Sequence, residues 1–190
     1  ASLAEGLRHH VTEVGARVPG ADLLVQLDEA SLPAVLAGQV PTESGFSTLR
    51  AVERSVVTEA LREVVRAVEV PVVVHCCAPD VPLAVIRDAG AVAVALDLDL
   101  LDDLDPVGEA VDAGLGVFAG AIATRARSAP SPDAVADRIR RLWSRLGFPA
   151  ERLATQVVVT QACGLAGATP DYARGALAAG REAARQLRNG

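Results

Sequence analysis

The residues best suited to chemistry are one histidine and two cysteines, each placed just after a predicted strand. His75, Cys76 and Cys77 directly follow the apolar run 71–74, and Cys163 lies 86 residues beyond Cys77. In extended chain, residues 75 and 77 point to one side while residue 76 points away. One imidazole and two thiolates are ligands that Zn²⁺ accepts, and zinc stabilises a bound thiol as thiolate. The pattern predicts a zinc site.

Carboxylates follow two other predicted strands. Asp97 comes directly after the apolar run 91–96, and Asp28 and Glu29 come after 22–27. A carboxylate can complete a zinc site, and Asp97 is the candidate. The pair at 28 and 29 has a second interpretation, because helix-starting residues come next and acids favour the first turn of a helix.

Each of these residues also has a purely structural interpretation. Buried cysteines pack as small hydrophobic residues, and a histidine such as His75 can satisfy its hydrogen bonds inside a core. A disulfide between Cys76 and Cys77 is a third possibility, disfavoured by ring strain. The acidic run 97–103 has no glycine at the turn position of a calcium loop, which favours a solvated loop.

Five short apolar runs rich in β-branched residues predict strands that are buried on both faces, as in a parallel sheet. Helical patterns with clear boundary signals lie between them. The pattern over 48–68 places Val56 on the apolar stripe of its helix, and the pattern over 131–147 does the same for Trp143. The expected strands are 22–27, 71–74, 91–96, 115–120 and 156–160, and the expected helices are 3–18, 48–68, 80–89, 105–114, 131–147 and 169–188.

Repeated strand–helix units require a parallel sheet with right-handed crossovers. The sheet is either an open doubly wound sheet or part of a (β/α)8 TIM barrel. No glycine-rich dinucleotide motif follows the first strand, whereas polar residues follow several strands, as in barrel active sites. A whole barrel needs about 250 residues and eight strands. We therefore expect this 190-residue chain to be a single domain, 1–190, that supplies strands 4–8 of a barrel.

Composition excludes several classes of function. The net charge is −6, and the 18 basic residues, all arginine, are scattered, so no basic surface for nucleic acid is expected. No apolar run reaches the ~20 residues of a membrane-spanning helix. Three cysteines do not form a secreted disulfide framework, which predicts a cytoplasmic protein.

Three motifs together resemble the C-terminal catalytic barrel of the cobalamin-independent methionine synthase family. They are Gln26-Leu27-Asp28-Glu29-Ala30, His75-Cys76-Cys77 and Ala162-Cys163-Gly164-Leu165, in the family's order and at similar spacing. The resemblance runs from about residue 22 to the last helix.

The resemblance implies that His75, Cys77 and Cys163 hold a zinc ion that activates the thiol of homocysteine for methyl transfer. Asp28, with Glu29 beside it, would bind the substrate's ammonium group. The family's fourth ligand is a glutamate, and the shorter Asp97 stands in its place. Asp97 is thus both the candidate fourth ligand and the candidate catalytic carboxylate.

The implied partners are a small thiol and a methyl donor, together with the N-terminal half of the barrel, because a five-strand piece would expose two sheet edges. The chain is therefore expected to be a fragment. Two alternatives remain open. One is a non-zinc enzyme of the same superfamily, similar to uroporphyrinogen decarboxylase, and the other is a relative that has lost catalysis.

Overall fold

The computed structural model describes residues 2–189, and its five strands form one sheet. Each strand neighbours the next strand in sequence, so the order β1-β2-β3-β4-β5 has no reversal. A doubly wound sheet reverses its order at a switch point, whereas a barrel does not. The predicted α/β class and the five strands are confirmed. The strands are β1 (Val25–Asp28), β2 (Val72–Cys76), β3 (Ala93–Asp97), β4 (Gly116–Ile122) and β5 (Val157–Gln161).

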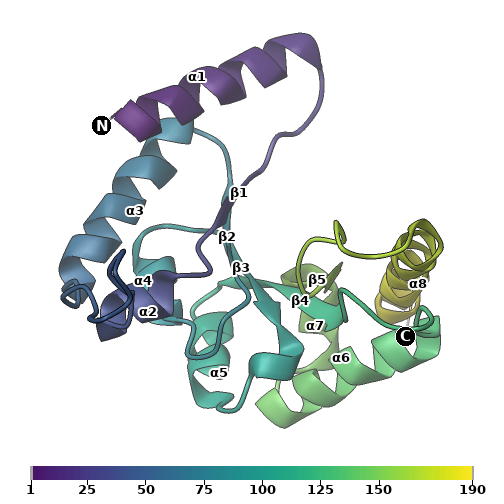
Figure 1. Cartoon of the computed structure of the whole chain (residues 1–190). Helices are drawn as coiled ribbons and strands as arrows, with labels where there is room; N and C mark the ends of the chain where they lie inside the picture. Colours follow the sequence, from purple (N-terminus) through teal and green to yellow (C-terminus); the bar gives the residue numbers. More distant parts are fainter. Residues whose placement is uncertain (1, 190) are drawn as a thin grey trace. The chain divides into compact units, whose positions relative to one another are not determined.

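The chain packs as two compact units, Ala1–Val94 and Ala95–Gly190. In the first unit, β1 and β2 pair in parallel, and the long helices α1 and α3 lie against each other (Figure 1). Helix α4 packs on α3. The helices of this unit are α1 (Ser2–Arg17), α2 (Leu32–Ala37), α3 (Arg54–Val68) and α4 (Leu83–Asp88).

In the second unit, β4 and β5 pair in parallel, and α6 and α8 lie side by side (Figure 1). The elements besides the strands are the 3₁₀ turn η1 (Leu98–Leu100), α5 (Asp105–Asp112), α6 (Pro132–Leu146), α7 (Ala150–Gln156) and α8 (Pro170–Asn189). No helix within residues 2–189 has both the length and the apolar character needed to cross a membrane.

Helix α6 shows how local sequence sets these boundaries. Ser131 caps its N-terminus, where its hydroxyl accepts a hydrogen bond from the Ala134 N–H at 3.2 Å. Gly147 ends the helix in the left-handed conformation, with a φ of 77°, which glycine adopts at little cost in free energy. Trp143 is buried, and its indole N–H donates to the carbonyl of Pro149 at 2.9 Å. The expected core position of Trp143 is confirmed.

The helix expected over 48–68 is wrong at its start, because α3 begins only at Arg54. The preceding segment is held in a loop instead, where the Leu49 N–H donates to the Val40 carbonyl at 2.7 Å and the Val52 N–H to the Val35 carbonyl. Val56, expected on the buried stripe, is 58% exposed. Backbone bonds to the chain around α2 therefore override the helical pattern.

Helices α2 and α7 were not expected from the sequence. They have only six and seven residues, too short to display a helical period. Helix α2 ends at Gly38, which adopts a φ of 66°. A Cβ at Gly38 would lie 2.9 Å from the backbone nitrogen of Ala51, so this tight turn requires glycine.

A β-bulge in β4 shifts its pairing with β5. Gly120 pairs with Thr160 but Ile122 pairs with Gln161, so one extra residue of β4 lies between them. The carbonyl of that residue, Ala121, accepts a hydrogen bond from Arg138 at 3.1 Å. The bulge thus bends β4 without leaving its backbone unsatisfied.

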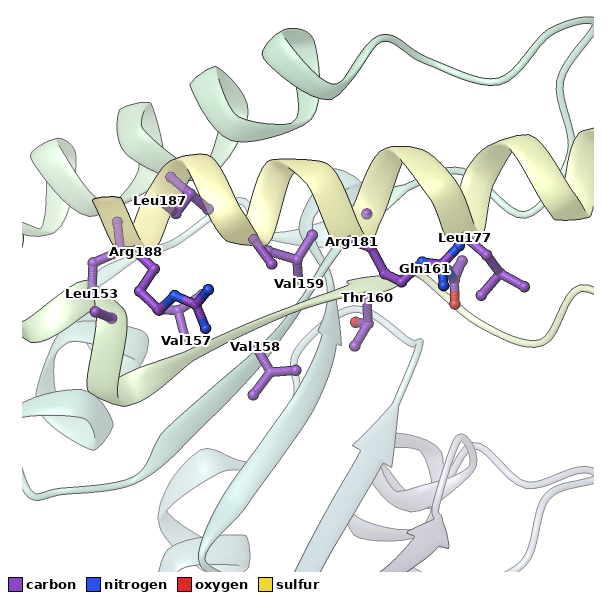
Figure 2. Close-up of a pocket in the computed structure, with 13 residues that line it drawn as sticks. Leu153, Val157, Val158, Val159, Thr160, Gln161, Leu177, Arg181, Leu187 and Arg188 are labelled. Atoms are coloured by element: carbon purple, nitrogen blue, oxygen red, sulfur yellow. The ribbon is translucent and has the colours of Figure 1, made fainter. Parts of the chain in front are cut away.

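Strand β5 borders an open pocket of about 430 Å³ whose other wall is α8 (Figure 2). Figure 2 shows side chains of both elements around this space, with Arg181 and Arg188 reaching into it from α8. Leu177 at its margin is 51% exposed. None of the candidate site residues lines this pocket. The pocket is an open surface formed mainly by β5 and α8.

Replacing Gly120 by alanine is expected to destabilise the second unit. The added Cβ would lie 2.7 Å from the Cα of Ala162 and closer still to the carbonyl oxygen of Leu96. Such overpacking costs about 1–3 kcal/mol in the free energy of unfolding. Gly108→Ala is the matched control, because its Cβ would meet only Leu146, at 3.7 Å. The control should gain about 0.5–1 kcal/mol, since alanine favours helix. Urea unfolding measures both changes, and equal stability of the two variants would contradict the packing described.

Candidate metal centre

Strand β2 carries the histidine of the candidate site at its carboxyl end. All five of its residues are buried, as the run of valines predicts. His75 is 8% exposed and is the one polar or charged residue of the described chain that counts as buried. Cys76 is fully buried, whereas Cys77, just past the strand, is half-buried. The two neighbouring cysteines thus occupy different environments, since β2 ends at Cys76.

Parallel pairing of β1 with β2 places Asp28 directly beside His75. The Asp28 Oδ1 atom lies 3.0 Å from His75 Nδ1, and the same oxygen accepts a hydrogen bond from Gln26 Nε2 at 2.9 Å. The backbone N–H of Glu29 donates to the carbonyl of His75 at 2.8 Å. His75 is therefore held at two points, its backbone carbonyl and the Nδ1 atom of its ring. No role was predicted for Gln26, although its position two residues before Asp28 puts both side chains on one face of β1.

Asp28 and Glu29 lie in contrasting surroundings. The Asp28 side chain is 71% exposed, whereas Glu29 is half-buried and lines a mostly apolar pocket of about 410 Å³ with residues of α1, α2 and α3. Burial, and then the charge of Asp28, raises the pKa of the Glu29 carboxyl. Asp28 thus contacts His75, while Glu29 borders the helices.

Cys163 follows β5 in the second unit. The Ala162 N–H donates to the carbonyl of Ile122 at 2.9 Å, which continues the sheet to the residue before Cys163. Beyond Cys163 the chain forms a loop that leads to α8 at Pro170. Tyr172 in the first turn of α8 donates its hydroxyl proton to the carbonyl of Ala123 at 2.6 Å. Both ends of the loop are therefore tied to residues at the end of β4, Ile122 and Ala123.

The ligand atoms of His75, Cys77 and Cys163 all lie within 4.8 Å of one another, so this cluster could hold a metal ion. Ligand atoms on a tetrahedral zinc lie about 3.7 Å apart, given its usual bond lengths. Two sulfurs and one imidazole form a donor set that zinc favours. The carboxylate on His75 Nδ1 is the partner that zinc-binding histidines ordinarily have. These residues fit zinc.

Asp97 lies outside that three-residue cluster. Its Oδ1 accepts a hydrogen bond from the Asp99 N–H at 2.9 Å and thereby caps the turn η1. Asp99 in turn accepts from Arg138 at 2.6 Å. The structure therefore gives Asp97 a capping role, and its role as a metal ligand stays a prediction.

None of the three cysteines forms a disulfide in the described chain, so Cys76 and Cys77 are not joined. Burial raises the pKa of the Cys76 thiol, more than the opposing hydrogen bond with the backbone of Ala78 lowers it. Cys76 therefore stays protonated and packs as a small core residue. The structural interpretation, left open for all the cysteines, holds for this one.

Several solved structures share the fold. The structure of a B12-independent methionine synthase from Shewanella sp. W3-18-1, in complex with selenomethionine, matches with a TM-score of 0.70 and 16% sequence identity. The match covers 98% of this chain and 54% of that one, so the chain spans about half the length of this relative. The likeness confirms the expected α/β class and is consistent with part of a barrel. No curated protein matches the chain.

The sequence also matches a protein family. Residues 2–186 match the family described as the catalytic domain of cobalamin-independent synthase. The match spans nearly all of the chain and includes all three motifs on which the resemblance was based. The chain therefore belongs to the cobalamin-independent synthase catalytic-domain family.

Proposed function

We propose that the chain is the zinc-binding part of a methyltransferase that methylates a small thiol, homocysteine or a close analogue, in methionine biosynthesis. The observation that carries this proposal is the cluster of His75, Cys77 and Cys163. Membership of the family supports the reaction type. The resemblance of the three motifs to the methionine synthases supports the thiol.

Three protein ligands suit a catalytic zinc site rather than a structural one. Structural zinc is closed by four protein ligands, whereas catalytic zinc keeps one position for water or substrate. When bound, zinc supplies the Lewis acidity that keeps a thiol deprotonated near neutral pH. The thiolates of Cys77 and Cys163 neutralise the charge of the ion, and an Asp97 carboxylate would add one negative charge. In this proposal the Asp97 carboxylate would occupy the fourth position only in the substrate-free protein, and a substrate thiol could take its place.

The remaining residues would bind and orient the substrate. Asp28 Oδ1 is engaged by His75 and Gln26. The side chain of Asp28 is largely exposed, so its second oxygen can receive the ammonium group of an amino acid. In this proposal Glu29 adds negative charge beside Asp28. Asp28 would hold the amino acid while its thiol approaches the metal.

The rest of a barrel is the proposed partner of this chain. The pocket of β5 and α8 exposes apolar side chains, including Leu177, along an edge strand (Figure 2). Proteins ordinarily cover such edges. In this proposal, further strands cover β5, and residues outside this chain help to bind the methyl donor. The proposed location is the cytoplasm, where thiols stay reduced.

Zinc retention tests the proposal directly. Purified protein should contain close to one zinc per chain, and Cys163→Ser should lose it, because a serine hydroxyl is a poor ligand for zinc. Cys76→Ala is the matched control: Cys76 is fully buried and outside the cluster, so this variant should keep its zinc. Metal analysis after dialysis against a weak chelator gives the readout.

Two results would contradict the assignment. Equal zinc content in Cys163→Ser and the wild type would remove Cys163 from the ligand set. Folded wild-type protein that binds no added zinc would favour the alternatives, a carboxylate enzyme related to uroporphyrinogen decarboxylase or an inactive relative.

A separate prediction concerns Glu29 and pH. Its folded pKa is raised, so the neutral form stabilises the protein below the ordinary pKa of about 4.3, and this stability is lost as pH rises through the folded pKa. Glu29→Gln should therefore be more stable than the wild type at neutral pH, with the difference vanishing in acid. The exposed Glu43→Gln should show no such gain. Urea unfolding at several pH values measures this, and a destabilised Glu29→Gln at neutral pH would contradict it.

A further inference from the structure

The hydrogen bonds around His75 point to a role for Asp28 that does not depend on substrate. An imidazole can coordinate a metal through only one nitrogen, and the partner of the other nitrogen decides which tautomer is present. In this chain the Nδ1 atom of His75 lies 3.0 Å from the Asp28 carboxylate. An ionised carboxylate only accepts hydrogen bonds, so Nδ1 must carry the proton. The Nε2 atom then has the lone pair that a metal needs.

The Asp28 carboxylate is itself held in place, although its side chain is largely exposed. Gln26, two residues earlier on β1, donates from Nε2 to the same Oδ1 atom at 2.9 Å. The β1–β2 register puts Asp28 beside His75, and the bond from the Glu29 N–H to the His75 carbonyl locks that register. An exposed aspartate without such contacts would sample many rotamers.

We infer that Asp28, oriented by Gln26, is a positioning residue that holds His75 as the Nδ1–H tautomer with Nε2 directed to the metal. Every contact in this chain of bonds lies within the first compact unit. The part that concerns the metal rests on the proposed function. The tautomer itself does not, because it follows from the bonds of the metal-free protein.

The same carboxylate can serve two purposes. Oδ1 orients the histidine, and the second oxygen can bind the ammonium group proposed above. A variant that keeps the acceptor but removes the charge separates these purposes. Asp28→Asn retains an oxygen that can accept from Nδ1–H, whereas Asp28→Ala retains none.

Nuclear magnetic resonance on ¹⁵N-labelled, metal-free protein tests the tautomer. The chain has only three histidines, so long-range ¹H–¹⁵N correlations at mildly alkaline pH can resolve the His75 ring. We expect the Nδ1–H form in the wild type and in Asp28→Asn, and a mixture of tautomers in Asp28→Ala. Gln26→Leu should shift the ring partway to that mixture. Asp22→Ala, which removes an exposed carboxylate before the same strand, should behave as the wild type.

Zinc affinity, measured without thiol by competition with a coloured chelator, gives the second readout. Loss of such a histidine partner lowers metal affinity about 10- to 100-fold. We expect this loss in Asp28→Ala, a smaller one in Asp28→Asn, and none in Asp22→Ala. An Nε2–H ring in the wild type, an unchanged ring in Asp28→Ala, or unchanged zinc affinity in that variant would each overturn the inference. If no variant binds zinc, the proposed function fails while the tautomer result still stands or falls on its own.

Discussion

The parallel register between β1 and β2 is the constraint on which the candidate site depends. It places Asp28 beside His75 and is fixed by backbone bonds that a side-chain substitution leaves intact. A shift of one residue would turn every side chain of β1 to the opposite face. His75 would then lose its carboxylate, and Glu29 would leave the apolar pocket. One pairing thus determines both the orientation of the imidazole and the surroundings of the two acids.

In the second unit, a β-bulge sets the register between β4 and β5. The extra residue in β4 changes its pairing with β5 by one position, and Arg138 satisfies the carbonyl that the bulge displaces. Gly120 permits the close approach of Leu96 and Ala162 on either side of it. Cys163 lies two residues beyond the end of β5. Its place in the unit is therefore set by backbone geometry.

The sequence predicted the strands well because each is a short apolar run that lies between helical patterns. It also predicted that Cys76 would face away from its neighbours, since strand alternation requires it. It failed at Val56 and at the start of α3, where loop hydrogen bonds decided the structure. Helices α2 and α7 were too short to show a period.

The site was predicted by residue type more than by contact. His75, Cys77 and Cys163 were recognisable as zinc ligands from their chemistry and position, and the structure brings them within reach of a metal ion. The link from Gln26 through Asp28 to His75 was not predicted, because it depends on the register between two strands. The capping role of Asp97 was also not predicted, since it depends on the turn η1 that the chain forms directly after β3.

The central claim is that an imidazole and two sulfurs bind one zinc ion that also accepts a substrate thiol. X-ray absorption spectroscopy at the zinc edge tests it most directly, because sulfur scatters differently from nitrogen and oxygen. We expect two sulfur ligands at about 2.3 Å in the substrate-free protein and a third when homocysteine is added. A zinc surrounded only by nitrogen and oxygen, or a sulfur shell that homocysteine does not change, would contradict it.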